Sequence, residues 1–429
     1  MNTCPEQNFE TAVPPAANER AAQTRWAELP VSRRLKFVRN FRHLLAAQSE
    51  ALAMAAAEPA CRPVAEKLVS EVLPLVDACR WLERRAARVL AARTCGVIDR
   101  PLWMLGLSFE VQRRPFGTVL VIGPGNYPLF LPAVHSLHAL TAGNSVLLKP
   151  APGTADVALA FARLTRLAGL DPTLLTILPD SVAAAQRAIA CGVDKVIFTG
   201  SSESGREVLS RLARTNTPAV MELSGEDVVL VLADADAELV VKALKFGMRL
   251  NGGATCMAPR RIIVVESLAA VLAAGMSRED LSLPVEKVPN EETAVQRILA
   301  RRFALGVSIF SRDISRARAI AQSIPSGFVL INDLIVPTAD PRMPFGGVKA
   351  SGFGVTRGDE GLLEMTHPHV VAVRRGKLRP HYDEPLAGDA RLFSSYIAVT
   401  HGRGLRRLAA LRSLFAAAIG RTKERKAGS

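Results

Sequence analysis

The sequence predicts an α/β protein with a doubly wound parallel sheet, followed by a second, smaller α/β unit. From Thr118 to Leu223, short apolar runs alternate with amphipathic stretches of helical period. The runs are apolar throughout rather than at every second position, which is typical of strands buried on both faces by helices. Such sheets bind ligands, often dinucleotides, at the carboxyl ends of their strands.

The first unit begins with helices. Residues 1–20 are polar and contain Pro14 and Pro15, so we expect a flexible N-terminus. Residues 26–92 are rich in Ala, Leu and Arg and have a helical period, and residues 109–115 alternate like an edge or hairpin strand. The pattern then predicts a dinucleotide-binding domain over residues 21–224, with strands at 118–123, 145–149, 174–178, 195–198 and 219–223 and helices at 128–143, 156–169, 182–192 and 202–214.

The second unit is expected over residues 225–375. Its predicted strands are 228–232, 261–265, 307–311 and 328–333, and its predicted helices are 236–250 and 314–324. A glycine-rich stretch, "MPFGGVKASGFG" at 343–354, closes this unit. From residue 376 onward the chain reads as a basic C-terminal tail.

Composition excludes several classes of protein. A hydrophobic share of 49% excludes wholesale disorder. The six cysteines are scattered without a CxxC pair, so we expect no disulfide framework and no metal site, and we expect a cytoplasmic protein. Residues 115–148 hold no charged side chain, but prolines and glycines interrupt them, so a buried strand–turn–helix–strand is favoured over a membrane span.

The net charge of +14 is concentrated at the C-terminus. Residues 401–429 hold eight Lys and Arg against Glu424, which is half of the excess. No nucleic-acid motif accompanies it, so we expect no nucleic-acid partner. Within 404–420, Leu408, Leu411, Phe415 and Ala418 fall near one helical face, so this segment either contacts an anionic membrane surface or packs on its own domain or a partner subunit. The first alternative would place the protein peripherally on the inner membrane face.

Four short motifs carry candidate chemistry, and each also has an ordinary structural interpretation. Cys256 in "NGGATCMAPRR" is a candidate nucleophile or a small buried hydrophobe. The stretch "IFTGSSESG" at 197–205 is a candidate pyrophosphate site at a helix N-terminus or a capped helix. Glu222 in "MELSGED" is a base or a strand-end carboxylate, and Asn126 in "GPGNYPL" is a hydrogen-bond donor or a turn former.

Six motifs that occur in a fixed order favour the chemical interpretations of these residues over the structural ones. "GPGNYPL", "LLKP", "FTGSSESG", "ELSGED", "NGGATCMAPRR" and "PFGGVKASGFG" together resemble the aldehyde dehydrogenase superfamily, from about Trp26 to Val373. The separations of 23 residues from Asn126 to Lys149 and 34 from Glu222 to Cys256 fit the family pattern. The resemblance implies a Rossmann-like cofactor domain, a catalytic domain and oxidation of an aldehyde to a carboxylic acid.

The resemblance also implies roles for three residues. Cys256 would attack the aldehyde carbonyl, and the oxyanion would be held by the Asn126 amide and the Cys256 backbone N–H. After hydride transfer leaves a thioester, Glu222 would act as general base on water. Because family members that transfer the acyl group to coenzyme A commonly lack this glutamate, its presence favours a free acid product.

The implied cofactor is NAD or NADP. Lys149 resembles the residue that binds the adenosine ribose, and Pro152 stands where an acid often excludes a 2′-phosphate, so we expect dual use or an NADP preference. Gly200 and Ser201 would lie by the pyrophosphate. The other cofactor contacts that the resemblance implies are Pro150, Gly205, Leu223, Asp280 and Phe345.

Two departures from the family pattern leave an alternative open. Gly125 stands where a tryptophan is common, and the alignment puts Asp280 and Ser282 of "DLSLPV" at the family's E-x-F-G-P motif, only 24 residues after Cys256. The catalytic domain is therefore expected to be shortened and its cleft unusually open. The protein is a dehydrogenase or, alternatively, a weakly active or inactive nucleotide-binding pseudoenzyme. The family's habit implies a homodimer.

Overall fold

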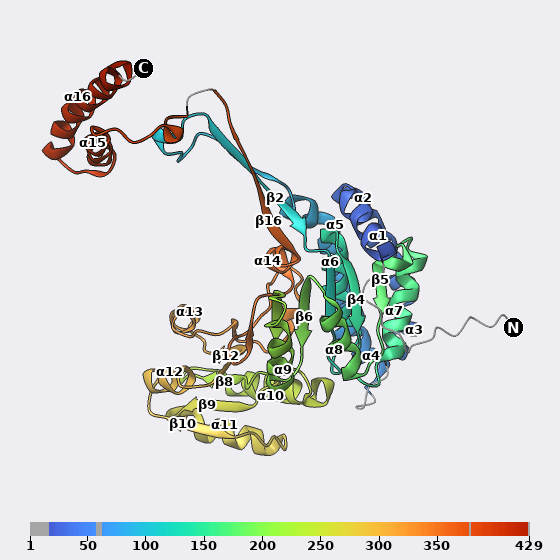
Figure 1. Cartoon of the computed structure of the whole chain (residues 1–429). Coiled ribbons are helices and arrows are strands. Elements are labelled where there is room, and N and C mark those ends of the chain that lie inside the picture. The colour runs from blue at the N-terminus through green and yellow to red at the C-terminus, as the bar shows by residue number, and fades with distance from the viewer. Residues whose placement is uncertain (1–16, 57–61, 377–378, 428–429) are drawn as a thin grey trace. The chain divides into compact units, whose positions relative to one another are not determined.

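The computed structural model describes residues 17–56, 62–376 and 379–427. The chain divides into two compact units, one of Met1–Cys95 and Phe109–Val371 and the other of Gly96–Ser108 and Ala372–Ser429 (Figure 1). The expected flexible N-terminus lies largely outside the described residues. Its last part is helical, because α1 (Ala17–Glu28) begins inside the segment that we expected to be flexible.

N-terminal helices pack against the helices that cover one face of the first sheet. They are α2 (Val31–Ala47), α3 (Ser49–Ala55), α4 (Val64–Lys67) and α5 (Leu73–Val89), with a π-helical turn at Leu68–Val72 between the last two. The carboxylate of Glu71, in the π-turn, pairs with Arg62 at 2.7 Å and accepts hydrogen bonds from the backbone N–H groups of Leu129 and Phe130. This buried contact fixes the start of the next helix, just after Asn126.

The first sheet has six strands in the order β15-β7-β6-β3-β4-β5. Its parallel strands are β3 (Thr118–Ile122), β4 (Ser145–Lys149), β5 (Leu175–Ile177), β6 (Lys195–Thr199) and β7 (Ala219–Glu222), which confirms the predicted doubly wound sheet. Helices α6 (Phe130–Ala142) and α7 (Ala155–Leu167) cover one face, and α8 (Val182–Cys191) and α9 (Ser202–Leu212) the other. Every residue of α6 is buried, which explains the charge-free stretch. No helix in the described ranges is long and apolar enough to cross a membrane.

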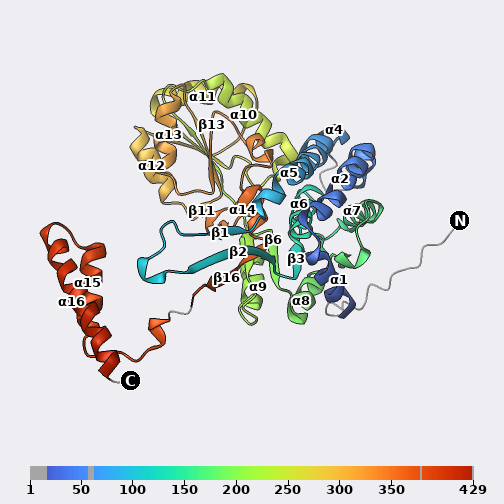
Figure 2. The ribbon, with the colours of Figure 1, turned by 90° about the horizontal axis from the view of Figure 1, so that it is seen from above.

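The second sheet is entirely parallel, with the order β10-β9-β8-β12-β13. Its strands are β8 (Val228–Val231), β9 (Arg261–Val265), β10 (Val285–Val288), β12 (Gly306–Phe310) and β13 (Phe328–Ile331). One face packs on α10 (Ala237–Arg249) and α11 (Glu266–Arg278), and the other on α12 (Glu291–Leu299) and α13 (Ile314–Gln322) (Figure 2). The sequence patterns missed α11, β10 and α12. The single helix α11 joins β9 directly to β10, so the segment after Cys256 is short.

The glycine-rich stretch returns the chain to the first sheet. After β14 (Val348–Lys349), which pairs with β11 (Phe303–Ala304), the short strand β15 (Gly352–Phe353) pairs antiparallel with β7. Gly352 has φ +109°, and a Cβ there would lie 1.8 Å from the carbonyl oxygen of Met221. Only glycine fits such an approach, so this residue lets the strand reach the end of β7 beside Glu222.

A third sheet contains β1 (Arg93–Cys95), β2 (Leu107–Pro115) and β16 (Thr366–Arg374), in that order. Strand β16 follows α14 (Gly358–Leu363) and was not predicted, whereas β2 matches the expected strand at 109–115.

The second unit contains a helical pair where we expected a tail. Helices α15 (Asp389–His401) and α16 (Leu405–Ala427) follow a short 3₁₀ turn at Pro380–Tyr382. The helical pattern at 404–420 is confirmed and extended, but α15 was not predicted.

Candidate active site

A cavity of about 760 Å³ lies where the two large sheets of the first unit meet. The first sheet contributes segments that follow the carboxyl ends of β3, β6 and β7, including Asn126, Gly200 and Glu222. The second sheet contributes segments that precede β8 and β9, including Cys256. Parallel strands bring their carboxyl ends to one edge, so this is the expected ligand position for the first sheet. Much of the remaining wall is apolar, from Leu73, Phe130, Leu131, Phe246, Leu250 and Met257.

Hydrogen bonds between two loops hold the cysteine side of the cavity. The Asn126 amide nitrogen donates to the carbonyl of Ala254 at 2.8 Å, and the Asn251 amide nitrogen donates to the carbonyl of Asn126 at 2.7 Å. The hydroxyls of Tyr127 and Thr255 lie 2.7 Å apart. An amide nitrogen carries two hydrogens, so Asn126 keeps one donor for an oxygen in the cavity.

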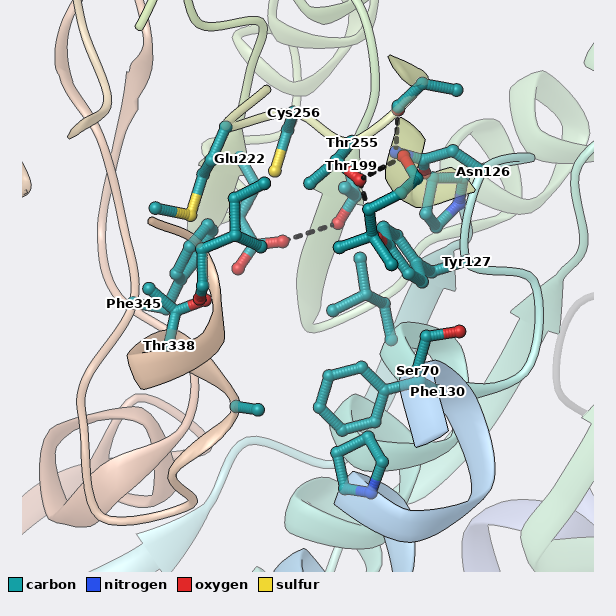
Figure 3. A pocket seen from close by; sticks show the side chains of 18 of the residues that line it. Ser70, Asn126, Tyr127, Phe130, Thr199, Glu222, Thr255, Cys256, Thr338 and Phe345 are labelled. Carbon is teal, nitrogen blue, oxygen red and sulfur yellow. Dashed lines mark hydrogen bonds between the residues drawn. The ribbon is translucent and has the colours of Figure 1, made fainter. Parts of the chain in front are cut away.

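Cys256 lies next to these contacts, and its sulfur points into the cavity (Figure 3). Burial, together with the carboxylates of Asp227 and Glu222, raises the pKa of the Cys256 thiol to about 12. The free protein therefore holds a neutral thiol at ordinary pH.

Asp227 is a buried carboxyl group that the sequence did not single out. It lies in the turn between Glu222 and β8 and accepts a hydrogen bond from the Gly306 backbone N–H at 3.3 Å. Burial raises the pKa of Asp227 well above its ordinary value, against the hydrogen bond from Gly306 and the charge of Arg260.

Glu222 ends β7 and is almost fully buried in a polar cluster. The Thr199 hydroxyl donates to one carboxylate oxygen at 2.8 Å, and the Thr356 hydroxyl donates to the other. Figure 3 shows the carboxylate facing the same cavity as the Cys256 sulfur. Its two hydroxyl partners come from segments that are distant in sequence, β6 and the loop after β15.

Two cationic or ionisable neighbours complete this cluster. His135 of α6 is buried, its Nε2 lies 3.6 Å from Glu222, and neither ring nitrogen has a hydrogen-bond partner among the described residues. The buried Arg357 guanidinium stacks 4.3 Å from the centre of the Phe345 ring. Burial alone raises the pKa of a carboxyl group, but His135, Thr356 and Arg357 outweigh it and hold the pKa of Glu222 below its ordinary value.

The expected phosphate and ribose residues lie along the carboxyl edge of the first sheet. Lys149 ends β4 and is mostly buried, Pro150 follows it, and Gly200 lines the cavity at the end of β6. Ser201 caps α9, with its side chain accepting from the Ser204 backbone N–H at 3.1 Å. Gly205 lies so close to Leu223 that a Cβ there would come within 2.5 Å of that side chain.

These residues fit a dinucleotide. The N-terminus of α9 presents backbone N–H groups, and the buried Lys149 ammonium forms no ion pair with any described residue, so both can bind an anionic or hydroxyl-bearing ligand. Burial lowers the pKa of Lys149, against the charge of Asp180. Asp180 was not predicted. Its carboxylate accepts a hydrogen bond from the Gly153 backbone N–H at 2.8 Å. A negative charge therefore lies close to Pro152, although the sequence has no acid at position 152 itself.

The remaining two expected cofactor residues differ in position. Phe345 lines the cavity, and its ring packs at a tilt against the ring of Phe328. Asp280 is exposed at the end of α11 and, like Ser282, does not line the cavity. Both precede β10, the outermost strand, so they lie beyond the strand that follows Cys256.

The fold and the site together are those of a doubly wound α/β protein with a cysteine in a cleft beside the carboxyl ends of its first sheet. Comparison of sequences identifies the family: the profile of the aldehyde dehydrogenase family matches residues 1–279 and 282–371, so the chain belongs to that family. The match is interrupted at residues 280–281, next to the shortened segment.

Curated relatives are aldehyde-oxidising proteins by name. The 4,4′-diapolycopene aldehyde oxidase of Methylomonas sp. is 28% identical, covering 89% of this chain and 86% of its own length. That alignment spans 457 positions, more than the 429 residues of this chain, so the relative has residues that this chain lacks. A succinate-semialdehyde dehydrogenase [NADP(+)] of Deinococcus radiodurans is 27% identical, covering 87% and 92%.

Solved structures confirm the fold. A substrate-bound state of Staphylococcus aureus AldH has a TM-score of 0.80 at 20% identity, covering 89% of this chain and 98% of that one. PnpE in complex with nicotinamide adenine dinucleotide has a TM-score of 0.78 at 21% identity, covering 86% and 91%.

Proposed function

We propose that the protein oxidises an aldehyde to a free carboxylic acid through a thioester on Cys256, with NAD or NADP as the electron acceptor. The observation that carries this proposal is the convergence of Cys256, Asn126 and Glu222 on one cavity from three separate segments of the chain. A thiol, an amide donor and a carboxylate are the groups that acyl chemistry at a carbonyl requires.

In the first step, the Cys256 thiol loses its proton to solvent water, its sulfur adds to the aldehyde carbon, and the carbonyl oxygen gains the electron pair. The remaining N–H of Asn126 and the Cys256 backbone N–H stabilise that oxyanion. Lys149 and the N-terminus of α9 would hold NAD or NADP, which would supply the acceptor for the hydride that leaves this carbon. The chain's own contribution is to hold the sulfur and the amide in fixed relation, which the hydrogen bond from Asn126 to Ala254 does.

In the second step, Glu222 takes a proton from water, which adds to the thioester carbon and releases the acid and the Cys256 thiol. Because the pKa of Glu222 lies below its ordinary value, the carboxylate is ionised and able to accept that proton at neutral pH. Its threonine partners keep it oriented until water enters the cavity.

The substrate we propose has an apolar chain or an aromatic ring. The cavity wall includes Leu73, Val69 and Val336, which are more than half exposed, as well as the buried Leu131. A second carboxylate against these side chains costs affinity, and Arg260 and Arg357 are the cationic lining residues that could offset this cost.

For the cofactor we propose that Asp180 influences the choice. Its carboxylate lies beside Gly153 and acts on Lys149, in the neighbourhood where the resemblance puts the adenosine ribose. It would repel a 2′-phosphate, and this effect opposes the NADP preference that Pro152 favours.

The test is reduced-cofactor absorbance with NAD⁺ or NADP⁺ and a panel of decanal, benzaldehyde and succinic semialdehyde. The proposal expects turnover of the first two, with kcat/KM at least about 100-fold above that for succinic semialdehyde. Cys256→Ser is the control, because it should bind cofactor normally and turn over nothing.

A second candidate function rests on the position of Asp280. This residue is exposed and does not line the cavity, so it is not placed to make the ribose contact that the resemblance implies. A nucleotide-binding protein with weak or no turnover would give little or no reduced cofactor for any aldehyde in the same assay, while a fluorescence titration would still show cofactor binding.

We also propose a homodimer. The second unit exposes Val97, Ile98, Leu102, Trp103 and Leu105 in the loop between β1 and β2, and exposed apolar side chains of this number mark contact surfaces. Sedimentation velocity should give a dimer for the whole chain and a monomer for Ile98→Ser/Trp103→Ser. A dimer in both would sink this assignment.

A further inference from the structure

Helices α15 and α16 form an antiparallel pair. Arg421 near the end of α16 forms an ion pair at 2.7 Å with Asp389 at the start of α15. In the middle of the pair, the hydroxyls of Ser395 and Ser413 are hydrogen-bonded at 2.9 Å. Figures 1 and 2 both show the two helices side by side. These polar contacts fix which faces of the helices point toward each other.

The opposite face of α16 carries exposed apolar side chains. Leu405, Leu408, Phe415 and Ile419 are between 59% and 83% exposed. With Arg412 between them, they follow each other at intervals of three and four residues, so they form one stripe along the helix. Ser413 and Arg421, which contact α15, lie off this stripe. Helix α15 also has two large exposed apolar side chains, Phe393 and Ile397, one helical turn apart.

The same pair of helices is strongly cationic. Between residues 389 and 423 the sequence has seven Lys and Arg against one acid, Asp389, and that acid is already paired with Arg421. Among the described residues, the exposed Arg406, Arg407 and Arg412 form no ion pair. Apolar side chains flanked by unpaired arginines are the features with which an interfacial helix enters the headgroup region of an anionic bilayer.

We propose that the outer face of α16, defined by Leu408, Phe415 and Ile419 with the exposed Arg406, Arg407 and Arg412, docks on an anionic membrane surface. The helices lie on the surface without crossing it, in keeping with the lack of a membrane-spanning helix in the described residues. Charge favours this occupant over a second copy of the same chain, since two cationic faces repel each other. The aromatic and aliphatic side chains favour it over nucleic acid, which requires phosphate and base contacts.

This surface is independent of the proposed chemistry, so its test uses binding rather than turnover. The whole protein is sedimented with vesicles of phosphatidylcholine alone and of phosphatidylcholine with phosphatidylglycerol. We expect binding to the mixed vesicles only, weakening as salt is added. The variant Leu408→Ser/Phe415→Ser/Ile419→Ser should lower the partition coefficient by about tenfold or more.

Two further variants keep the result interpretable. Arg406→Gln/Arg407→Gln/Arg412→Gln retains the apolar stripe and good helix formers, and it should weaken binding to the mixed vesicles. Val182→Ser/Leu239→Ser removes exposed apolar side chains of the first unit and should bind like the unaltered protein.

Three outcomes overturn the proposal. One is equal binding to both kinds of vesicle, and another is unchanged binding after removal of the apolar stripe. The third is failure to bind either kind of vesicle. In that case, a lower sedimentation coefficient of the variant without the apolar stripe would identify the face as a contact between copies of the chain. Retention of the protein on single-stranded RNA would instead identify a nucleic-acid surface.

Discussion

Cys256 and Glu222 line the same cavity, yet their surroundings act on their protonation in opposite directions. Cys256 lies near two carboxyl groups, which add to the effect of burial and raise the pKa of its thiol. Glu222 is more completely buried than Cys256 but lies near His135, Thr356 and Arg357, which lower the pKa of its carboxyl. The free protein thus keeps a nucleophile that holds its proton beside a base that can accept one, and environments that separate two pKa values in this way mark distinct chemical roles.

The surroundings of Cys256 and of Glu222 also differ in the kind of contact that holds them. Loop-to-loop hydrogen bonds hold Asn126 and Thr255 beside the cysteine, so substitutions there change geometry. Side chains from β6, α6 and the segment after β15 surround Glu222, so substitutions there change charge. Substitutions on each side can therefore separate effects of geometry near Cys256 from effects of charge near Glu222.

Cys256→Ser should lower kcat by on the order of 10⁴-fold or more, because the hydroxyl is a weaker nucleophile and no other thiol among the described residues lines the cavity. Stopped-flow absorbance of reduced cofactor measures the loss, and fluorescence titration should show an unchanged cofactor Kd. Residual turnover within tenfold of the unaltered protein would remove the cysteine from the chemistry.

The thiol's raised pKa predicts a steep pH dependence of alkylation. A pKa of about 12 leaves the thiolate a small fraction at pH 7, so the rate of Cys256 labelling by iodoacetamide in the free protein should rise about tenfold per pH unit between pH 7 and pH 10. Mass spectrometry of the peptide that contains Cys256 measures it. A plateau near pH 8 would contradict the proposed electrostatics of this side.

Asn126→Ala should lower kcat by about 10²- to 10³-fold, because one oxyanion donor is lost. Cofactor Kd should stay within twofold. If KM rises while kcat is unchanged, Asn126 binds substrate without stabilising the oxyanion.

His135→Gln should move the acid limb of the kcat profile upward by roughly one pH unit. The sign follows from the contacts: removing His135 takes away a partner that lowers the pKa of Glu222, while burial still raises it, so the ionised base is lost at a higher pH. His138→Gln is the control. That ring stacks on Trp81 and its pKa is lowered to about 3 by burial, so its loss should affect stability and leave the limb in place.

Asp180→Asn should be the smallest change, lowering the Kd for NADP⁺ relative to NAD⁺ by about tenfold. Fluorescence titration of both nucleotides measures the ratio without any turnover. An unchanged ratio would leave Pro152 as the dominant influence.

Much of this fold could be predicted from periodicity. The strands from β3 to β7 are apolar runs between amphipathic helices, and burial on both faces leaves that pattern in the sequence. By contrast, β10 ("VEKV") is an edge strand whose two central residues are charged, so it lacks the apolar run of a buried strand. Helix α15 lies in a segment whose basic composition suggested a tail. Local patterns of this kind do not reveal tertiary partners.

The site was predictable to the same degree. Cys256, Glu222 and Asn126 stand in motifs, and the structure places all three on the cavity. His135, Thr356, Arg357 and Asp180 carry no signal of their own, because their effect depends on what the fold brings next to them. Asp280 is the opposite case. The resemblance predicted that it contacts the cofactor, but in the structure it does not line the cavity.

The most direct test of the thioester is a single-turnover experiment on Glu222→Gln with decanal and NAD⁺ or NADP⁺. With the water-activating base removed, we expect a burst of reduced cofactor equal to the amount of protein, a steady rate lower by about 10²- to 10⁴-fold, and the decanoyl mass on the peptide that contains Cys256. A burst with no acyl group on that peptide, or steady turnover at the unaltered rate, would contradict the account.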